Sequence, residues 1–428
     1  MERARIVTRA LRHRNFRLFA SGQMLSIIGT WVQMVAQSWL VYRLSGSPVM
    51  LGLVGFAGQI PYLVLAPIAG VMADRANLRR LLSITQVLMM LQAFLLAALT
   101  LSGAVRVWHV FLLALALGVI GIFDMTVRQS FLVEMVGKED LMNAIALNST
   151  VYNSGRILGP AVAGVLVAVV GEGYCFVING CTFLALIGSL WMMRLPPWKP
   201  QAAAFSPWQH FREGWNYVRT NAPSRTLLIH LGTVSVMSYP FVVLMPVFAD
   251  RILQGGPKAL GLLMSSVGVG AILGSLYMAA RTGLHGLSRS ITQATLVYSA
   301  ALILFAFSPY LYVSCLLLMV VGSGMMLQMA ATNTALQTIT PDALRGRVIS
   351  FYGMMFQGML PLGSLMAGWL GEWIGAPYAV AFGAGVCIVA ALVFDRKRPV
   401  VRAALQQVME QKAELLPVPV TRSNEDGR

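Results

Sequence analysis

Charged residues are scarce in this chain: they make up 11% of its 428 residues, whereas hydrophobic residues make up 57%. Acidic residues are the scarcer kind, with 16 Asp and Glu against 32 Lys and Arg. So little charge, together with a mean hydropathy of +0.70, excludes an ordinary soluble globular protein. It leaves membrane proteins as the class to consider.

Cysteine is also rare, with four residues in all. Their spacing is typical neither of a metal site nor of a disulfide framework, so we interpret them as small apolar packing residues. The sequence contains no Walker loop, metal-ligand cluster or catalytic triad. We therefore expect a protein that is not an enzyme and that uses neither a cofactor nor a bound metal.

Apolar runs of about 20 residues recur along the whole chain, and such a run is long enough to cross roughly 30 Å of hydrocarbon as a helix. They predict an all-α membrane protein with twelve transmembrane helices. The expected spans are 16–42, 48–73, 80–102, 107–127, 145–170, 173–193, 226–249, 258–280, 288–307, 309–332, 348–370 and 376–394.

The net charge of +16 would suggest nucleic-acid binding in a soluble chain, but here the positions of the basic residues give another explanation. All but five of the Lys and Arg residues fall on one side of the predicted membrane. The exceptions are Arg43, Arg106, Arg251 and Lys258 on the other side and Arg156 within a span. By the positive-inside rule, both termini are expected in the cytoplasm of a multi-pass inner-membrane protein. The lipid bilayer is then an expected partner, and nucleic acid is not.

The longest connection on the basic side divides the chain almost in half, which predicts a six-helix bundle at 1–194 and another at 225–394. The connection, 195–224, contains an amphipathic stretch over 208–219. Residues 395–428 are expected to form a flexible cytoplasmic tail. The two halves also resemble each other, since 136–141 before the fifth span parallels 339–344 before the eleventh. Such a parallel repeat is typical of transporters whose site lies at the midplane between the halves.

Several segments together resemble the major facilitator superfamily over most of the chain. Two of them, 70–80 and 153–164, resemble the loop 2/3 signature and the span 5 motif of drug and proton antiporters. The segments 16–19, 29–31, 146–149 and 345–348 are similar to its enterobactin-exporter-like, or transmembrane secretion effector, branch. One departure is Leu78, at a position where that branch usually has an arginine. The span 4 arginine of many proton-coupled relatives is also absent from the region around Gly118.

The resemblance implies two pseudo-symmetric six-helix bundles that rock about a central site lined by spans 1, 5, 7, 8, 10 and 11. It also implies a small-molecule substrate, coupling to protons and function as a monomer. For the loop signature it implies a gate, in which Asp74 contacts the start of span 11 and the loop arginines contact Asp124. The alternative is that the loop merely ends a helix. The expected gate residues are Gly70, Asp74, Arg75, Arg79, Arg80, Asp124, Arg345 and Arg347.

Arg156 is the one charge that we expect deep within a span, with every acid in a loop, tail or helix end. A bare charge in hydrocarbon is costly, so Arg156 should face a watery cavity and favour anionic or polyhydroxylated cargo, or else serve a structural role. The first span carries polar residues on one helical face, and span 5 does much the same, either to line the cavity or to bond between helices. The substrate-binding candidates are Gln23, Ser26, Thr30, Gln33, Gln37, Tyr152, Asn153 and Arg156.

Small residues on one face of span 5 predict close approach of another helix, and Pro160 frees a backbone carbonyl. The motif comprises Gly155, Gly159, Pro160 and Gly164. From all these features we expect a secondary exporter, proton-coupled, of a small metabolite such as a siderophore or of amphiphilic drugs. Two alternatives stay open within transport, a lysophospholipid flippase and an importer. A third, from another class, is a transporter-like sensor or assembly protein without flux.

Overall fold

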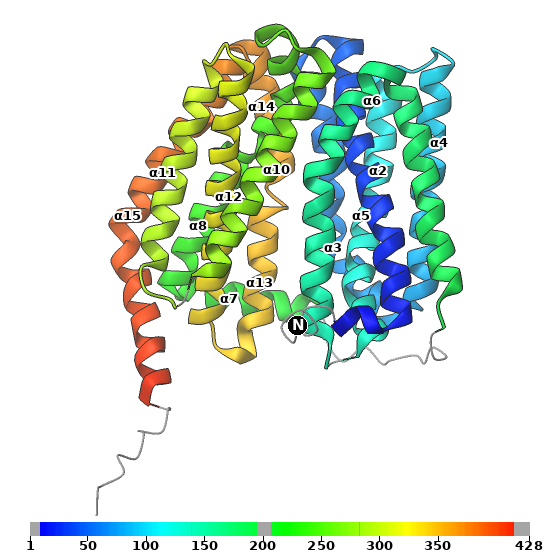
Figure 1. Cartoon of the computed structure of the whole chain (residues 1–428). Helices are drawn as coiled ribbons and strands as arrows, with labels where there is room; N and C mark the ends of the chain where they lie inside the picture. Colours follow the sequence, from blue (N-terminus) through cyan, green and yellow to red (C-terminus); the bar gives the residue numbers. More distant parts are fainter. Residues whose placement is uncertain (1–8, 138, 195–206, 282, 415–428) are drawn as a thin grey trace, which may run out of the picture.

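The computed structural model describes residues 9–137, 139–194, 207–281 and 283–414, and all regular elements in these ranges are helices. The side chains of Pro67, Asp74, 207–210 and 412–414 lie outside the described part. The N-terminal half contains η1 (Arg9–Arg12), α2 (Arg14–Ser45), α3 (Pro48–Arg75), α4 (Leu78–Leu101), α5 (Val107–Val136) and α6 (Leu141–Met192). Figure 1 shows these helices running side by side along one axis.

The second half begins after the connecting helix α7 (Pro207–Thr220). Its seventh span is composed of α8 (Ala222–Met237), η2 (Tyr239–Leu244), α9 (Met245–Val247) and the π-helical turn η3 (Phe248–Ile252). Next come α10 (Gly256–Ala280), α11 (Leu287–Ala306) and α12 (Leu311–Ile339). The last elements are α13 (Asp342–Phe356), α14 (Leu360–Trp373) and α15 (Ala376–Glu414).

Eleven of these helical stretches are long and apolar enough to cross a membrane, and one of them crosses twice. The 52 residues of α6 would extend about 78 Å at 1.5 Å per residue, far more than a bilayer core. The helix breaks at Gly171, whose φ of 81° and ψ of 171° are not helical. The break separates the fifth span from the sixth and confirms the twelve predicted crossings.

Two helices continue beyond the spans predicted for them. The fourth span continues as α5 to Val136, so Asp124 and Arg128 lie within the helix rather than at its end. The expected flexible tail after residue 394 continues as α15 to Glu414, with Val401 and Leu405 buried against the second half. Residues 415–428 lie outside the described residues. In both cases, packing against neighbouring helices extends a helix beyond the apolar run.

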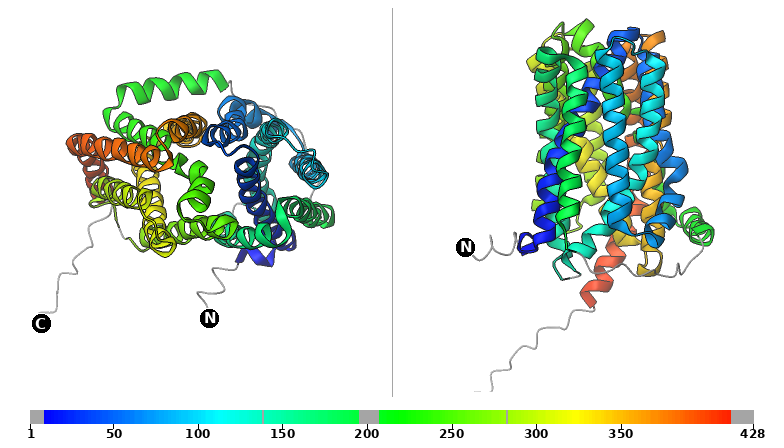
Figure 2. Two further views of the ribbon diagram at one scale, coloured as in Figure 1. Left: turned by 90° about the horizontal axis from the view of Figure 1, so that it is seen from above. Right: turned by 90° about the vertical axis from the view of Figure 1, so that its right-hand side faces the viewer.

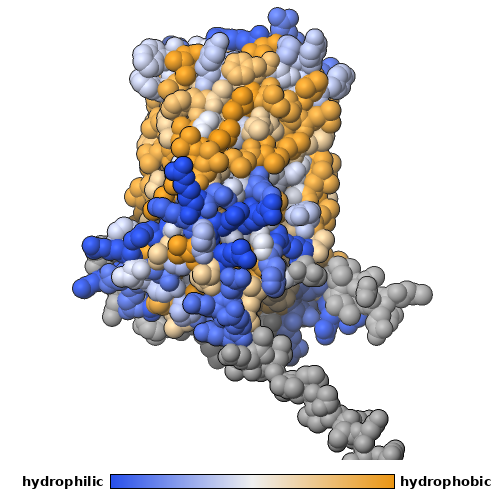
Figure 3. Space-filling view, turned by 90° about the vertical axis from the view of Figure 1, so that its left-hand side faces the viewer, coloured by the Kyte–Doolittle hydropathy of each residue, from blue (hydrophilic) through white to orange (hydrophobic). Residues whose placement is uncertain are grey.

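The start of α2 and the end of α15 lie at the same end of the bundle, which we call the terminal end, and we call the opposite end the far end (Figure 1). Viewed along the axis, the two halves stand on opposite sides of the molecule (Figure 2). Apolar residues form a broad band over the upper part of the face that Figure 3 shows, and hydrophilic residues gather below it toward the terminal end. This distribution is that of a multi-pass membrane protein.

The buried apolar side chains show where the two halves meet. One large cluster joins them, with Val41 and Val167 of the first half alongside Phe248 and Leu263 of the second. Toward the terminal end, the clusters are separate: one contains only first-half residues around Phe131, and another only second-half residues around Phe351. The halves are therefore packed together toward the far end and have separate cores toward the terminal end.

Candidate functional site

Two spans of the second half are interrupted, and their breaks lie next to each other. The seventh span leaves α-helical geometry at Ser238 and continues as the 3-10 turn η2, which contains Pro240. The eleventh span is interrupted between Phe356 and Leu360, where α13 ends and α14 begins. The rings of Tyr239 and Phe356 pack edge to face with centroids 5.2 Å apart. In membrane transporters, discontinuous helices typically form the substrate site.

Arg156 lies in the fifth span, which belongs to the first half, whereas both breaks belong to the second half. It is half-buried, and Tyr152 and Tyr239 are its electrostatic neighbours. Its backbone is fixed by close contact with α10, because a Cβ at Gly268 would lie 2.9 Å from the Arg156 carbonyl oxygen. Among the described residues, no side chain pairs with its guanidinium. The arrangement offers a free cation beside aromatic rings from the other half.

The polar side chains of the first span fall into two groups, one buried and one exposed. Gln33 is buried and bonded within its own half: its Nε2 donates to Gln92 at 2.9 Å, and its Oε1 accepts from Asn179 at 2.7 Å. Gln23 is also buried and donates to Asn148 at 2.9 Å. Thr30 is exposed, although its hydroxyl donates to the Ser26 carbonyl. The geometry thus favours interhelical bonding for the two glutamines.

The remaining candidates on the two spans are less enclosed. Gln37 and Asn153 are half-buried, and Asn153 donates to the Ser149 carbonyl of its own helix at 2.9 Å. Tyr152 is 55% exposed. These side chains, with Arg156, are the ones that remain accessible for a ligand.

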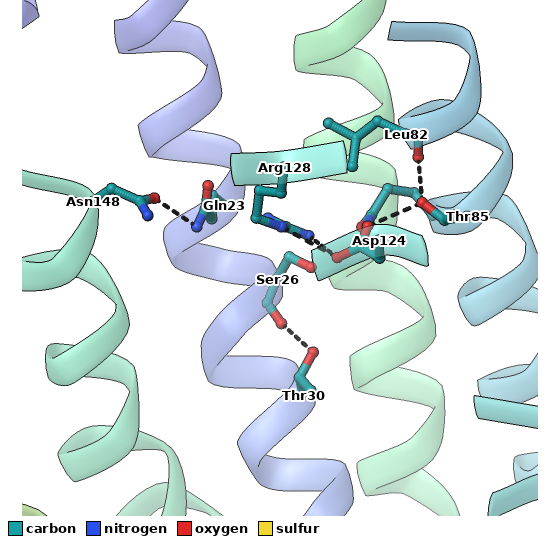
Figure 4. A network of polar contacts seen from close by, with 9 residues as sticks. Gln23, Ser26, Thr30, Leu82, Thr85, Asp124, Arg128 and Asn148 are labelled. Atoms are coloured by element: carbon teal, nitrogen blue, oxygen red, sulfur yellow. Dashed lines mark hydrogen bonds and ion pairs between the residues drawn. The ribbon is translucent and has the colours of Figure 1, made fainter. Parts of the chain in front are cut away.

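Asp124 is a carboxylate buried in the first half, inside α5, whereas we expected every acid in a loop, tail or helix end. Its Oδ2 accepts from Arg128 Nη2 at 2.7 Å, one helical turn further on, and its Oδ1 accepts from Gln86 at 2.5 Å. Thr85 Oγ1 lies 2.9 Å from the same oxygen. Figure 4 shows Arg128 between Asp124 and the helix that carries Gln23. The guanidinium also lies 5.8 Å from the ring centroid of Phe19.

The structure does not bring the loop arginines together with Asp124. Asp124 takes Arg128 from its own helix, whereas Arg79 donates to the Trp191 carbonyl at 3.0 Å. Leu78 is buried among first-half side chains, so the departure from the family pattern places an apolar residue in a core. The sequence signal for the true pair was the spacing of an acid and an arginine by four residues in a continuing apolar run.

The other expected gate contact involves Asp74, whose side chain lies outside the described part of the structure. Both of its expected partners pair with other acids: Arg345 with Asp342 of the same helix, and Arg347 with Glu213 of α7. Around Gly70 a Cβ would meet nothing within 4 Å, so packing does not require glycine there. Arg75 and Arg80 are exposed at this end.

The small residues of the fifth span serve two neighbours. A Cβ at Gly155 would lie 2.2 Å from Ile27 and one at Gly159 would lie 2.3 Å from Trp31. Both glycines therefore allow the first span to pack closely against the fifth. Gly164 instead crosses α10, where a Cβ would lie 2.9 Å from the Gly261 Cα. This crossing connects the two halves toward the far end.

Polar contacts reinforce the junction at the far end. Tyr42 donates to Asp250 at 3.1 Å, and Arg251 donates to the Gly46 carbonyl at 2.8 Å. Ser47 donates to Glu372 at 2.6 Å. Both Asp250 and Arg251 are carried by the π-helical turn η3, a distortion that often marks functional sites. Because each contact joins one half to the other, the far end is closed in this structure.

We expect Asp124→Asn to lower the stability of the purified protein by about 3–5 kcal/mol, because it leaves Arg128, whose side chain is only 17% exposed, without its counter-charge. Thermal unfolding in detergent measures the loss. Asp342→Asn, which breaks an exposed pair at the terminal end, is the matched control and should cost less than about 1 kcal/mol. The double variant Asp124→Asn/Arg128→Gln should recover part of the loss. Equal costs for Asp124→Asn and the control would contradict a buried, charged pair.

Twelve crossings in two halves, with a polar site between interrupted helices, define a membrane transporter of the major facilitator type. Comparison with known protein families gives the same class. Residues 8–424 match the transmembrane secretion effector family, and this chain belongs to that family of the major facilitator superfamily. Proteins of this kind move small molecules across membranes and are not enzymes.

Three relatives share low identity over most of their length. The chain is 26% identical to the staphyloferrin A transporter of Staphylococcus aureus, covering 81% of this chain and 87% of the relative. It is 28% identical to the multidrug efflux pump Tap of Mycolicibacterium fortuitum, with the same coverage of both. It is 25% identical to the enterobactin exporter EntS of Shigella boydii, covering 89% of this chain and 91% of the relative.

Among solved structures, the fold is similar to that of a bacterial homologue of the lysosomal transporter Spinster in an inward-facing, unoccupied conformation. The TM-score is 0.65 at 14% identity, covering 93% of this chain and 98% of the other. At this identity the likeness concerns the fold alone.

Proposed function

We propose that this protein is a proton-coupled exporter of the bacterial inner membrane, with both termini in the cytoplasm. The orientation rests on the basic residues, which gather at the terminal end. With that orientation, the closed far end faces away from the cytoplasm, and the separate cores of the two halves face the cytoplasm. The structure then corresponds to the state that takes up cargo from inside the cell.

The observation that carries the proposed substrate class is the unpaired Arg156 beside the two helix breaks. A half-buried guanidinium without a described counter-charge attracts an anion. Tyr239 and Phe356 offer ring faces and edges to an apolar or aromatic part of the same molecule. We therefore propose a small organic anion of siderophore type, such as a polycarboxylate or catecholate, as the cargo.

For the proton we propose Asp124. It is a carboxylate within a span, and its charge is held by Arg128, Gln86 and Thr85. Because Arg128, Gln86 and Thr85 all stabilise the charged carboxylate, proton binding requires an arrangement of α2, α4 and α5 that separates Asp124 from Arg128. Coupling then requires only that the protonated and charged forms favour different arrangements of the two halves.

The test is export into proteoliposomes against imposed pH gradients. We expect uptake of an anionic siderophore into inside-out vesicles when a proton gradient is present and loss of that uptake with a protonophore. Uncharged and cationic amphiphiles of similar size serve as the matched controls and should move at least tenfold more slowly. Transport that ignores the gradient would contradict proton coupling, and equal rates for cations and anions would contradict the substrate class.

Efflux of amphiphilic drugs is the second candidate, and the methionines near the site favour it. Tyr352 donates to the backbone carbonyl of Met329, which is half-buried, whereas Met325, whose carbonyl accepts from Tyr239, has its side chain buried in the core. Flexible methionine suits varied apolar ligands. Movement of cations faster than anions in the same assay would support this candidate. Lipid translocation would support a flippase, inward substrate movement an importer, and binding without flux a sensor.

A further inference from the structure

The connecting helix α7 lies outside the ring of spans at the terminal end, across their direction (Figure 2). It is attached to α13, the part of the eleventh span nearest this end. At Gly214 a Cβ would lie 2.9 Å from Phe351 Cε2 and 3.2 Å from Arg347 Cβ, so the two helices approach closely. Substitution of this glycine would separate them.

Charge and aromatic contacts strengthen this attachment. Glu213 pairs with Arg347, and the rings of Phe211 and Trp215 lie 5.1 Å and 6.2 Å from that of Phe351. Val218 is buried in the same cluster as Phe351. Because α7 binds through an ion pair, aromatic rings and a close backbone approach together, we expect α7 and α13 to move as one unit.

This unit is separable from the rest of the span. The break between Phe356 and Leu360 divides α13 from α14. Through Gly368, α14 packs closely on Gly52 of the first half, whereas α13 packs on α7, α8 and α12. A force on α7 therefore reaches α13 directly, and α13 is the part of the eleventh span nearest the terminal end.

The other face of α7 carries side chains suited to a membrane surface. Arg212, Asn216 and Arg219 are exposed at helical spacing, and Arg225 follows closely, donating to the Arg219 carbonyl at 3.0 Å. Trp215 is 49% exposed despite its contact with Phe351. Arginine beside tryptophan on a helix that lies across the spans is typical of an interfacial helix that binds anionic lipid.

We propose that α7 binds the headgroups of anionic phospholipids in the leaflet at the terminal end, and that this binding restrains α13 and so the inner gate. The assignment of this leaflet to the cytoplasmic side rests on the membrane orientation given in the proposed function. The phosphate of the lipid would lie against Arg212 and Arg219, with Trp215 at the level of the headgroups. Charge complementarity favours an anionic lipid as the ligand of this face, since each arginine near an anionic membrane surface contributes about 1 kcal/mol to binding, which is about fivefold in affinity.

The test compares amide hydrogen exchange of the full chain in nanodiscs of phosphatidylcholine with that in nanodiscs containing phosphatidylglycerol. No substrate or gradient is present, so the result is independent of whether the protein exports anything. We expect exchange in both 211–220 and 342–356 to slow by about fivefold or more with phosphatidylglycerol. Exchange in 378–392 should not change. High salt should remove the effect by screening.

Arg212→Gln/Arg219→Gln should abolish the lipid dependence in both segments. The matched control Arg289→Gln/Arg402→Gln removes two exposed arginines at the same end but not on α7, and should keep it. Equal exchange in the two lipids, or a dependence that survives the α7 variant, would overturn the proposal. Slowing confined to 211–220 would overturn the link to α13. A soluble glycerol phosphate that reproduces the effect in neutral nanodiscs would overturn lipid as the source.

Discussion

Replacing Arg156 by alanine should reduce export of an anionic substrate by roughly 10- to 150-fold. A hydrogen bond to a charged group contributes about 1.5–3 kcal/mol, and each 1.4 kcal/mol is tenfold in binding. Because no described side chain pairs with Arg156, its removal leaves no buried acid behind to destabilise the fold. The loss should therefore be in substrate affinity rather than in protein yield.

Substrate binding to the purified protein, measured by calorimetry, separates these effects, with transport as the second readout. Arg156→Lys should retain part of the affinity, since lysine keeps the charge but not the planar fork of donors. Arg289→Ala, which removes an exposed arginine at the terminal end, is the control and should bind as the wild type does. Unchanged binding in Arg156→Ala would assign the residue a structural role only.

Sequence alone predicted the architecture well, because membrane burial leaves a simple pattern. Every backbone polar group in hydrocarbon must be satisfied, so long apolar runs become helices, and basic loops mark one side. Where the runs end, the pattern gives less information. The helix α5 continues past the apolar run as far as Val136, because the side chains of this extension are buried against the first half. That extension places Asp124 in the interior of a helix rather than near its end.

The candidate site was only partly visible in the sequence, for a physical reason. Arg156 was evident as an isolated charge, but its neighbour Tyr239 comes from the other half, and contacts between halves have no local signal. The sequence did contain a weak indication of the two helix breaks, since Pro240 and Gly358 interrupt otherwise apolar spans. The pairing of Gln33 with Gln92 and Asn179 was equally inaccessible, because glutamine on a polar face suits either a cavity or a neighbouring helix.

Replacing Gly261 by leucine should abolish transport by removing the state in which the far end is closed. A Cβ at this position would lie 2.6 Å from the Pro160 carbonyl oxygen and 2.7 Å from the Gly164 Cα. Both obstacles are backbone, so the helices must separate. Overpacking costs about 1–3 kcal/mol, which shifts a two-state equilibrium by roughly 5- to 150-fold. The open arrangement of the far end has no such conflict and should become dominant.

The internal repeat predicts a second position with the same effect. Gly52 meets the Ser364 carbonyl oxygen and Gly368 as Gly261 meets the Pro160 carbonyl oxygen and Gly164. The offsets are close, with 209 residues between the two glycines and 204 between Ser364 and Pro160 and between Gly368 and Gly164. The crossings of α3 with α14 and of α10 with α6 are therefore equivalent halves of one closure. Gly52→Leu should open the far end as Gly261→Leu does.

Spin labels at two exposed far-end positions, Leu44 in the first half and Tyr378 in the second, report the change as a longer distance between the labels. Gly188→Leu is the matched control, because a Cβ there meets nothing within 4 Å, and it should leave both distance and transport unchanged. If Gly261→Leu keeps the wild-type distance, the closure tolerates overpacking and the two glycine crossings do not control it. If the distance grows while transport continues, closure of the far end is not a required step of the cycle.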